Sequence, residues 1–196
     1  MNIGIDIDNT ITNIEKDLFD SANKYTKTLN PNFENKNPVK FDGFVNMANF
    51  YMDIFGWNIE QIESFFRNER IEVIDNAFPR PGVVNVLKRL KNMGHNIFIV
   101  TARADKYDDM PYERSKNWLD KNGIVYDRLI IGATDKAKVC HDLEIEIFVD
   151  DQLNNCIKLA QGGIKTIRIT NSKKEYPNII NMENFEQIFE YICKLK

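Results

Sequence analysis

The chain begins with the segment NIGIDIDNT, residues 2–10, in which isoleucines alternate with glycine and acids. Successive side chains of a strand point to opposite sides, so the isoleucines share one face and Gly4, Asp6 and Asp8 share the other. An acid within an apolar strand destabilises a fold unless a charged group meets it. The segment therefore predicts a strand over residues 2–8 that ends in two functional acids.

Strand and helix patterns alternate from residue 81 onward. Apolar segments at residues 96–101, 129–131, 146–150 and 165–169 are typical of strands buried on both faces. Helices are expected at residues 81–93, 112–121, 135–143, 152–161 and 184–194. This alternation is typical of βαβ units, so we expect an α/β fold with a doubly wound parallel sheet, a Rossmann-type core.

Residues 12–80 interrupt that pattern. The stretch is rich in aromatic residues and reads as several short helices. Because so long a connection is seldom structureless in a compact domain, we expect a small helical cap over the sheet edge. The predicted domains are a core of residues 1–11 and 81–196 and a cap of residues 12–80.

Composition narrows the classes of protein. The chain has 26 Lys and Arg against 29 Asp and Glu, a net charge of −3, which argues against coating a nucleic acid polymer or an anionic membrane. No apolar run approaches the ~20 residues that span a bilayer, and the amino terminus lacks the pattern of a signal peptide. Three scattered cysteines favour a reducing compartment. We therefore expect a cytoplasmic protein.

Acids follow two of the predicted strands. Asp6 and Asp8 end the first, and Asp150 and Asp151 end the fourth. Ligands of open α/β sheets bind beyond these carboxyl ends, where four carboxylates would repel one another. Proton uptake or a hard cation would relieve the repulsion, and aspartates beside a hydroxyl and a lysine suit Mg²⁺ and a phosphoryl group.

These motifs identify a resemblance. Residues 6–10 (DIDNT), Thr101, Lys136 and residues 150–151, in this order, resemble the four motifs of the haloacid dehalogenase superfamily of phosphohydrolases. The insertion after the first motif resembles the C1-type cap of that superfamily. The stretches VTAR (100–103), PYER (111–114) and DK (135–136) are most similar to the 5′(3′)-deoxyribonucleotidase and nucleotidase group.

The resemblance implies a role for each acid. Asp6 would attack phosphorus and form an aspartyl phosphate. Asp8 would protonate the leaving oxygen and then deprotonate water, which requires a raised pKa that the neighbouring carboxylates could supply. The implied Mg²⁺ ligands are Asp6, the backbone carbonyl of Asp8, Asp150 and, directly or through water, Asp151. Asp151 could instead cap the following helix.

The resemblance also implies substrate contacts. Thr101 and the amide of Ala102 would hold the phosphoryl group, and Lys136 would offset its charge, with Lys138 as a rival for the lysine role. The further substrate-binding candidates are Arg103, which could instead pair with Asp105 or Asp108, Arg114 for phosphate, and Phe41, Phe44 and Trp57 for stacking on a base.

The function that we expect is a Mg²⁺-dependent phosphomonoesterase, foremost a nucleotidase acting on nucleoside monophosphates, as a monomer or homodimer. Another small phosphorylated metabolite is the alternative substrate. A phospho-receiver switch uses similar groups, but its acid pair would end the first strand, whereas here the pair ends the fourth. A nucleotide-binding module without hydrolysis would not need both Asp6 and Asp8.

Overall fold

The computed structural model describes residues 1–34, 47–104 and 106–195. In these residues six parallel strands form one sheet in the order β3-β2-β1-β4-β5-β6. The strands are β1 (Asn2–Ile5), β2 (Asn96–Val100), β3 (Arg128–Ile130), β4 (Ile147–Asp150), β5 (Lys165–Ile169) and β6 (Ile179–Met182). The predicted doubly wound parallel sheet is confirmed, and β6 is a strand that the sequence reading did not predict.

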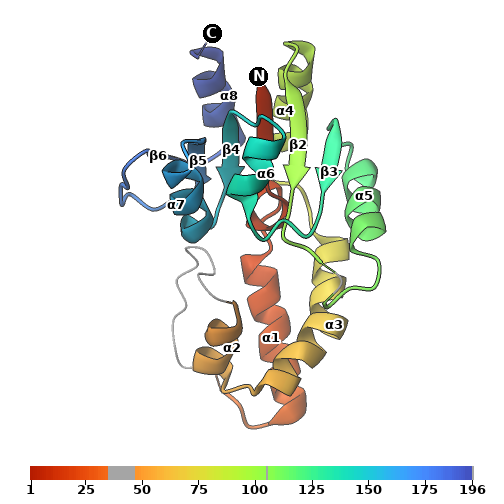
Figure 1. Cartoon of the computed structure of the whole chain (residues 1–196). Helices are drawn as coiled ribbons and strands as arrows, with labels where there is room; N and C mark the ends of the chain where they lie inside the picture. Colours follow the sequence, from red (N-terminus) through yellow and green to blue (C-terminus); the bar gives the residue numbers. More distant parts are fainter. Residues whose placement is uncertain (35–46, 105, 196) are drawn as a thin grey trace.

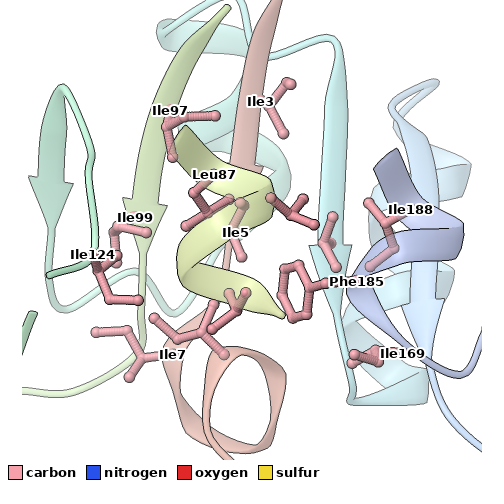
Figure 2. Close-up of a cluster of buried hydrophobic side chains, with 14 of the residues drawn as sticks. Ile3, Ile5, Ile7, Leu87, Ile97, Ile99, Ile124, Ile169, Phe185 and Ile188 are labelled. Atoms are coloured by element: carbon pink, nitrogen blue, oxygen red, sulfur yellow. The ribbon is translucent and has the colours of Figure 1, made fainter. Parts of the chain in front are cut away.

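Helices cover both faces of the sheet (Figure 1). The face with Ile3, Ile5 and Ile97 packs against α4 (Val83–Asn92), α5 (Pro111–Lys121) and α8 (Phe185–Cys193), and Figure 2 shows Leu87 of α4 and Phe185 of α8 against these isoleucines. The opposite face, with Phe98 and Phe148, packs against α6 (Lys136–Asp142) and α7 (Leu153–Gln161). Burial on both sides explains why the strands are nearly continuous apolar runs.

The first strand lies at the centre of the sheet. β1 pairs with β2 on one side and with β4 on the other. Gly4 fits there because a Cβ atom at this position would come within 2.4 Å of the Phe148 ring. Chain connections diverge on the two sides of β1, and in doubly wound sheets such a switch point is where ligands bind.

Three helices lie beyond the carboxyl ends of the strands (Figure 1). These cap helices are α1 (Glu15–Leu29), α2 (Met47–Phe55) and α3 (Ile59–Asn76). They share a hydrophobic cluster of their own, in which Tyr51, Trp57 and Phe65 are buried. The helices match the expected cap, while the division into domains of residues 1–11 with 81–196 and 12–80 stays a prediction.

None of the described helices combines the length and the apolar character that crossing a membrane requires.

Candidate active site

The first strand ends three residues earlier than the sequence predicts. β1 stops at Ile5, and the backbone N–H of Asp6 donates to the carbonyl of Val149 at 3.0 Å, which holds Asp6 beside β4. The chain then makes a wide turn over Ile7–Ile11, in which Asp8 and Asn9 have non-helical backbone angles. This turn explains why the strand does not continue to residue 8. Asn9 has a φ of 59°, in the left-handed region, which is incompatible with a strand.

Side chains of the DNT segment and its neighbours hold this turn. The Asn9 N–H donates to Thr12 Oγ1 at 3.0 Å, and Asn9 Oδ1 accepts from the Ile14 N–H at 3.1 Å. Arg80 donates to the Asn9 carbonyl through Nε at 3.2 Å and Nη2 at 2.7 Å. The turn that carries Asp8 is therefore tied to the segment that re-enters the core after the cap helices.

Lys136 joins the two acidic strand ends. Its Nζ lies 2.8 Å from Asp6 Oδ1 and 2.6 Å from Asp150 Oδ2, and its side chain is only 5% exposed. Lys138 instead pairs with Asp142 on the surface, with 68% of its side chain exposed. The structure therefore places Lys136, and not Lys138, beside the acids.

The start of α7 orients the Asp150 carboxylate. Oδ1 accepts from the Gln152 N–H at 2.8 Å, and the Asn155 amide lies 3.2 Å from Oδ2. Asp150 is fully buried. Because the first N–H groups of a helix have no partner within the helix, the start of α7 can fix the position of this carboxylate by hydrogen bonding.

Three buried carboxylates converge at this point. Ligand oxygens of Asp6, Asp150 and Asp151 all lie within 4.8 Å of one another, and Asp151 Oδ1 accepts from Thr10 Oγ1 at 3.2 Å. The single positive charge of Lys136 does not balance three negative charges. An all-oxygen donor set with uncompensated charge fits a hard divalent cation.

Burial and mutual repulsion change the protonation of this cluster. Burial raises the pKa of Asp6 to about 7, although Lys136 opposes the shift, and the charges of Asp150 and Asp8 add to it. Burial and the charges of Asp150 and Asp6 also raise the pKa of Asp151, although Lys136 opposes this shift. A bound cation would replace these protons, because carboxylates bind metals in their ionised form.

Asp8 differs from its expected state. Arg103 holds its carboxylate at two points, from Nη2 to Oδ1 at 2.6 Å and from Nε to Oδ2 at 3.1 Å, and Arg70 Nη2 lies 3.4 Å from Oδ2. Burial would raise the pKa of Asp8, but Arg103, and then Arg70 and Lys136, outweigh burial and lower it. The expectation that the pKa of Asp8 is raised is therefore wrong. The neighbouring carboxylates are outweighed by Arg103 and Arg70, which the sequence analysis did not place beside Asp8.

A cavity of about 440 Å³ opens between the acids and the cap helices. Thr101, Ala102 and Arg103 line it from the end of β2, opposite Leu18 and Ile74 of the cap helices. Thr101 is buried, and its Oγ1 accepts from the Arg103 N–H at 3.4 Å. The volume is within the usual range for small-molecule sites. The arrangement can therefore enclose a small ligand whose anionic end meets Asp6, Thr101 and Lys136.

Comparison with known proteins identifies the family. The model of the family described as "Haloacid dehalogenase-like hydrolase" matches residues 3–116, more than half of the chain. The chain belongs to this family. The predicted superfamily and the predicted class of enzyme, a hydrolase, are thereby confirmed.

Individual relatives of this hydrolase cover its whole length. A nucleotidase from Clostridium acetobutylicum is 27% identical over 100% of this chain and 95% of its own. A haloacid dehalogenase-like hydrolase from Streptococcus pneumoniae has a TM-score of 0.68 at 15% identity, over 97% of both chains. A hydrolase of the same superfamily from Geobacter sulfurreducens has a TM-score of 0.63 at 14% identity, over 97% of this chain and 98% of its own. The two structures support the fold.

The remaining candidates of this hydrolase lie in different places. Arg103 pairs with Asp8 rather than with Asp108, and its Nη1 donates to Ser115 Oγ of α5 at 3.2 Å. Arg114 binds Asp108 at 2.7 Å and also Asp75, and it is not among the residues that line the cavity. Asp105, Phe41 and Phe44 lie outside the described residues.

Trp57 is part of the cap core rather than of the cavity wall. Its ring stacks on Tyr51 with centroids 5.0 Å apart and planes 3° apart, and its indole N–H donates to Thr26 Oγ1 at 3.0 Å. It is absent from the lining of the cavity. The expectation that Trp57 stacks on a base is therefore not supported, because aromatic side chains already cover its ring and Thr26 already accepts from its N–H.

Several residues of the site were missed in the sequence. Asn155 lies four residues after Asp151, so its proximity to the acid pair was a usable signal, whereas Asn9 and Thr10 belong to the quoted DIDNT motif but were given no role. Arg70 and Arg80 come from the insertion and its end, where no local pattern distinguishes them from surface arginines. Only the packing of the cap helices against the sheet brings these two to Asp8 and Asn9.

Proposed function

We propose that this hydrolase is a phosphomonoesterase that works through an aspartyl-phosphate intermediate. The observation that carries the proposal is the placement of Asp6 at the floor of the cavity, bound to Lys136, with Asp8 on the next turn of chain. A nucleophilic carboxylate and a second carboxylate for proton transfer are the two groups that such a reaction needs.

The reaction would use the residues of the site in two steps. In the first step an Asp6 oxygen forms a bond to phosphorus while the bond from phosphorus to the leaving oxygen breaks, and that oxygen takes a proton from Asp8. In the second step Asp8 removes a proton from water, whose oxygen attacks phosphorus and releases Asp6. Asp8 must be protonated for the first step, so Arg103 and Arg70 must release part of their hold on it when substrate binds.

A magnesium ion fits the acidic cluster. Asp6, Asp150, Asp151 and the backbone carbonyl of Asp8 are the proposed ligands. The convergence of the three carboxylates supports this set, as do the raised pKa values of Asp6 and Asp151. When bound, Mg²⁺ would neutralise charge on the phosphoryl oxygens. Thr101, the Ala102 amide and Lys136 would hold the remaining phosphoryl oxygens.

The proposed substrate is a nucleoside monophosphate. The name of the relative from C. acetobutylicum, a nucleotidase, and a cavity of about 440 Å³ with apolar side chains from the cap support this class. Another small phosphorylated metabolite is the second candidate, because the charged end of the site would accept any phosphomonoester. Cytoplasmic location and a monomeric or homodimeric state remain predictions.

Substitution of Asp6 tests the mechanism. Asp6→Asn should reduce hydrolysis of p-nitrophenyl phosphate at least about 10³-fold, because the amide is a poor nucleophile toward phosphorus. The matched control is Asp142→Asn, an exposed acid paired with Lys138, which should keep wild-type activity. Circular dichroism should show both variants folded. Activity of Asp6→Asn near that of the control would exclude Asp6 as the nucleophile.

The substrate class needs a separate screen. Phosphate release should be fastest from a 5′- or 3′-nucleoside monophosphate among ribo- and deoxyribonucleotides and sugar phosphates. A sugar phosphate at the top of the ranking would reject the nucleotide and keep the mechanism.

A further inference from the structure

Arg70 lies where the cap helices meet the catalytic acids. It comes from α3, lines the cavity, and contacts Asp8 through Nη2 at 3.4 Å. Its Nε atom is buried and has no hydrogen-bond partner among the described residues. A buried N–H without an acceptor costs stability, so its retention at a cavity wall points to an acceptor that arrives with a ligand.

The contact with Asp8 does not account for this placement. Arg103 already binds both Asp8 oxygens, at 2.6 and 3.1 Å, whereas Arg70 approaches one of them at 3.4 Å. The weaker contact can be exchanged for a better acceptor without leaving Asp8 unpaired. Among the described residues it is also the only hydrogen bond that the Arg70 side chain makes.

An aromatic pair supports the guanidinium. The Arg70 Cζ atom lies 5.5 Å from the centre of the Phe66 ring, within the range of a cation–π contact. The Phe66 ring meets the Tyr107 ring edge to face at 5.0 Å. All three residues line the same cavity, Phe66 and Arg70 from α3 and Tyr107 from the segment after β2. The guanidinium is thus held at the wall rather than free in solvent.

We propose that Arg70 is a specificity-determining residue that donates hydrogen bonds to acceptor oxygens or nitrogens of the substrate's leaving group. The inference rests on the proposed function, in which Asp8 protonates the leaving oxygen. A donor that contacts Asp8 from the cap side then lies beside the leaving group, not beside the transferred phosphoryl group. Its ligands are the hydroxyl or carbonyl acceptors of a sugar or base, which a planar fork of N–H groups can bind in pairs.

A ratio of substrates isolates this role. We would measure kcat/KM for the best phosphomonoester of the screen and for phenyl phosphate, whose leaving group has no acceptor besides the ester oxygen. Arg70→Met should lower the ratio of the two values about 10- to 100-fold, because a hydrogen bond to a charged donor is lost for one substrate only. Arg67→Met is the matched control, an exposed arginine of α3 that does not line the cavity, and should leave the ratio unchanged.

The two kcat/KM values distinguish a direct contact of Arg70 with the leaving group from an indirect effect through Asp8. An equal loss of kcat/KM for both substrates would mean that Arg70 acts only through Asp8, and unchanged values for both substrates would mean that it does not contact the leaving group. Either result overturns the proposal, as does a finding that phenyl phosphate is the best substrate. Arg70→Lys keeps the charge but loses the planar set of N–H donors, so it should lower the ratio by a smaller factor. This variant also tests the proposal if Arg70→Met does not fold. Full activity of Asp6→Asn would refute the proposed mechanism without affecting the measured ratio.

Discussion

Lys136 links two carboxylates that come from different strands, Asp6 after β1 and Asp150 at the end of β4. Burial would lower the pKa of Lys136, but Asp150 and Asp6 outweigh burial and raise it, so the ammonium stays charged. Its α6 neighbour Lys138 has the same chemistry but an exposed partner, Asp142. One position of α6 therefore matters to the site, while the other contributes little.

Paired substitutions test this difference. Lys136→Met should lower kcat for p-nitrophenyl phosphate at least about 10²-fold and destabilise the protein by about 3 kcal/mol or more, because it leaves buried carboxylates without their partner. Lys138→Met should change kcat less than about 3-fold and stability by less than about 0.5 kcal/mol. Steady-state kinetics and urea unfolding give both numbers. Equally small effects of the two substitutions would remove Lys136 from the site.

At the scale of elements, the cap helices form a structural unit around aromatic side chains. Tyr51, Phe55, Trp57 and Phe65 pack with ring centroids 5.0 to 6.0 Å apart, and Trp57 also binds Thr26 of α1. The cluster includes Phe65 and Phe66 in the first half of α3, about one turn before Arg70 of the same helix. We therefore expect Trp57 to support stability rather than to contact the substrate.

Substitution of Trp57 separates the two roles. Trp57→Ala should destabilise the protein by about 3–5 kcal/mol, because it opens a cavity in the cap core. Phe78→Ala is the control: this ring is 84% exposed, and its loss should cost less than about 0.5 kcal/mol. Trp57→Phe, which keeps a ring and loses the N–H, should leave KM within about 3-fold of wild type. If Trp57 stacks on substrate, KM would rise steeply in both Trp57 variants while urea unfolding stayed unchanged.

At the scale of the whole molecule, the strand order brings the acids together. β1 and β4 are neighbours at the switch point of the sheet, although more than 140 residues separate Asp6 from Asp150. The cap helices lie beyond the same strand ends (Figure 1). The fold therefore concentrates negative charge where a cation and a phosphoryl group would relieve it, and the stability of the protein should depend on both metal and pH.

The pH dependence follows from Asp6. Its pKa of about 7 in the folded state exceeds its ordinary value of 3.8, so the folded protein retains a proton that the unfolded chain releases. Stability of the metal-free protein should thus fall as pH rises from about 4 to 7. Mg²⁺ should restore it most at pH 8, where no proton competes, raising Tm by roughly 5–10 °C at 100 times its Kd.

Thermal unfolding with and without Mg²⁺ at pH 5.5 and pH 8 checks this expectation. The rise in Tm at pH 5.5 should be less than half of that at pH 8, and Asp6→Asn should remove most of the difference between the two pH values. If Mg²⁺ does not change Tm at either pH value, this result would contradict a metal site at Asp6, Asp150 and Asp151.

Local patterns in the sequence were sufficient for the strand–helix alternation of the core and for the acids at the ends of β1 and β4. Strands buried on both faces need long apolar runs, and an ionisable residue at the end of such a run is conspicuous. β6 was not predicted because its short segment IINM (Ile179–Met182) mixes apolar and polar residues. The early end of β1 escaped too, because it depends on side-chain hydrogen bonds of Asn9 and Thr12.

The partners of these acids came from contacts between distant parts of the chain. Lys136 and Lys138 look alike in the sequence, and only the direction in which α6 faces separates the buried lysine from the exposed one. Arg103 and Arg70 reverse the expected pKa shift of Asp8, because an electrostatic shift depends on distances in space that no local pattern encodes. Trp57 belongs to the cap core for the same reason: which of many aromatic residues line a cavity depends on how the helices pack.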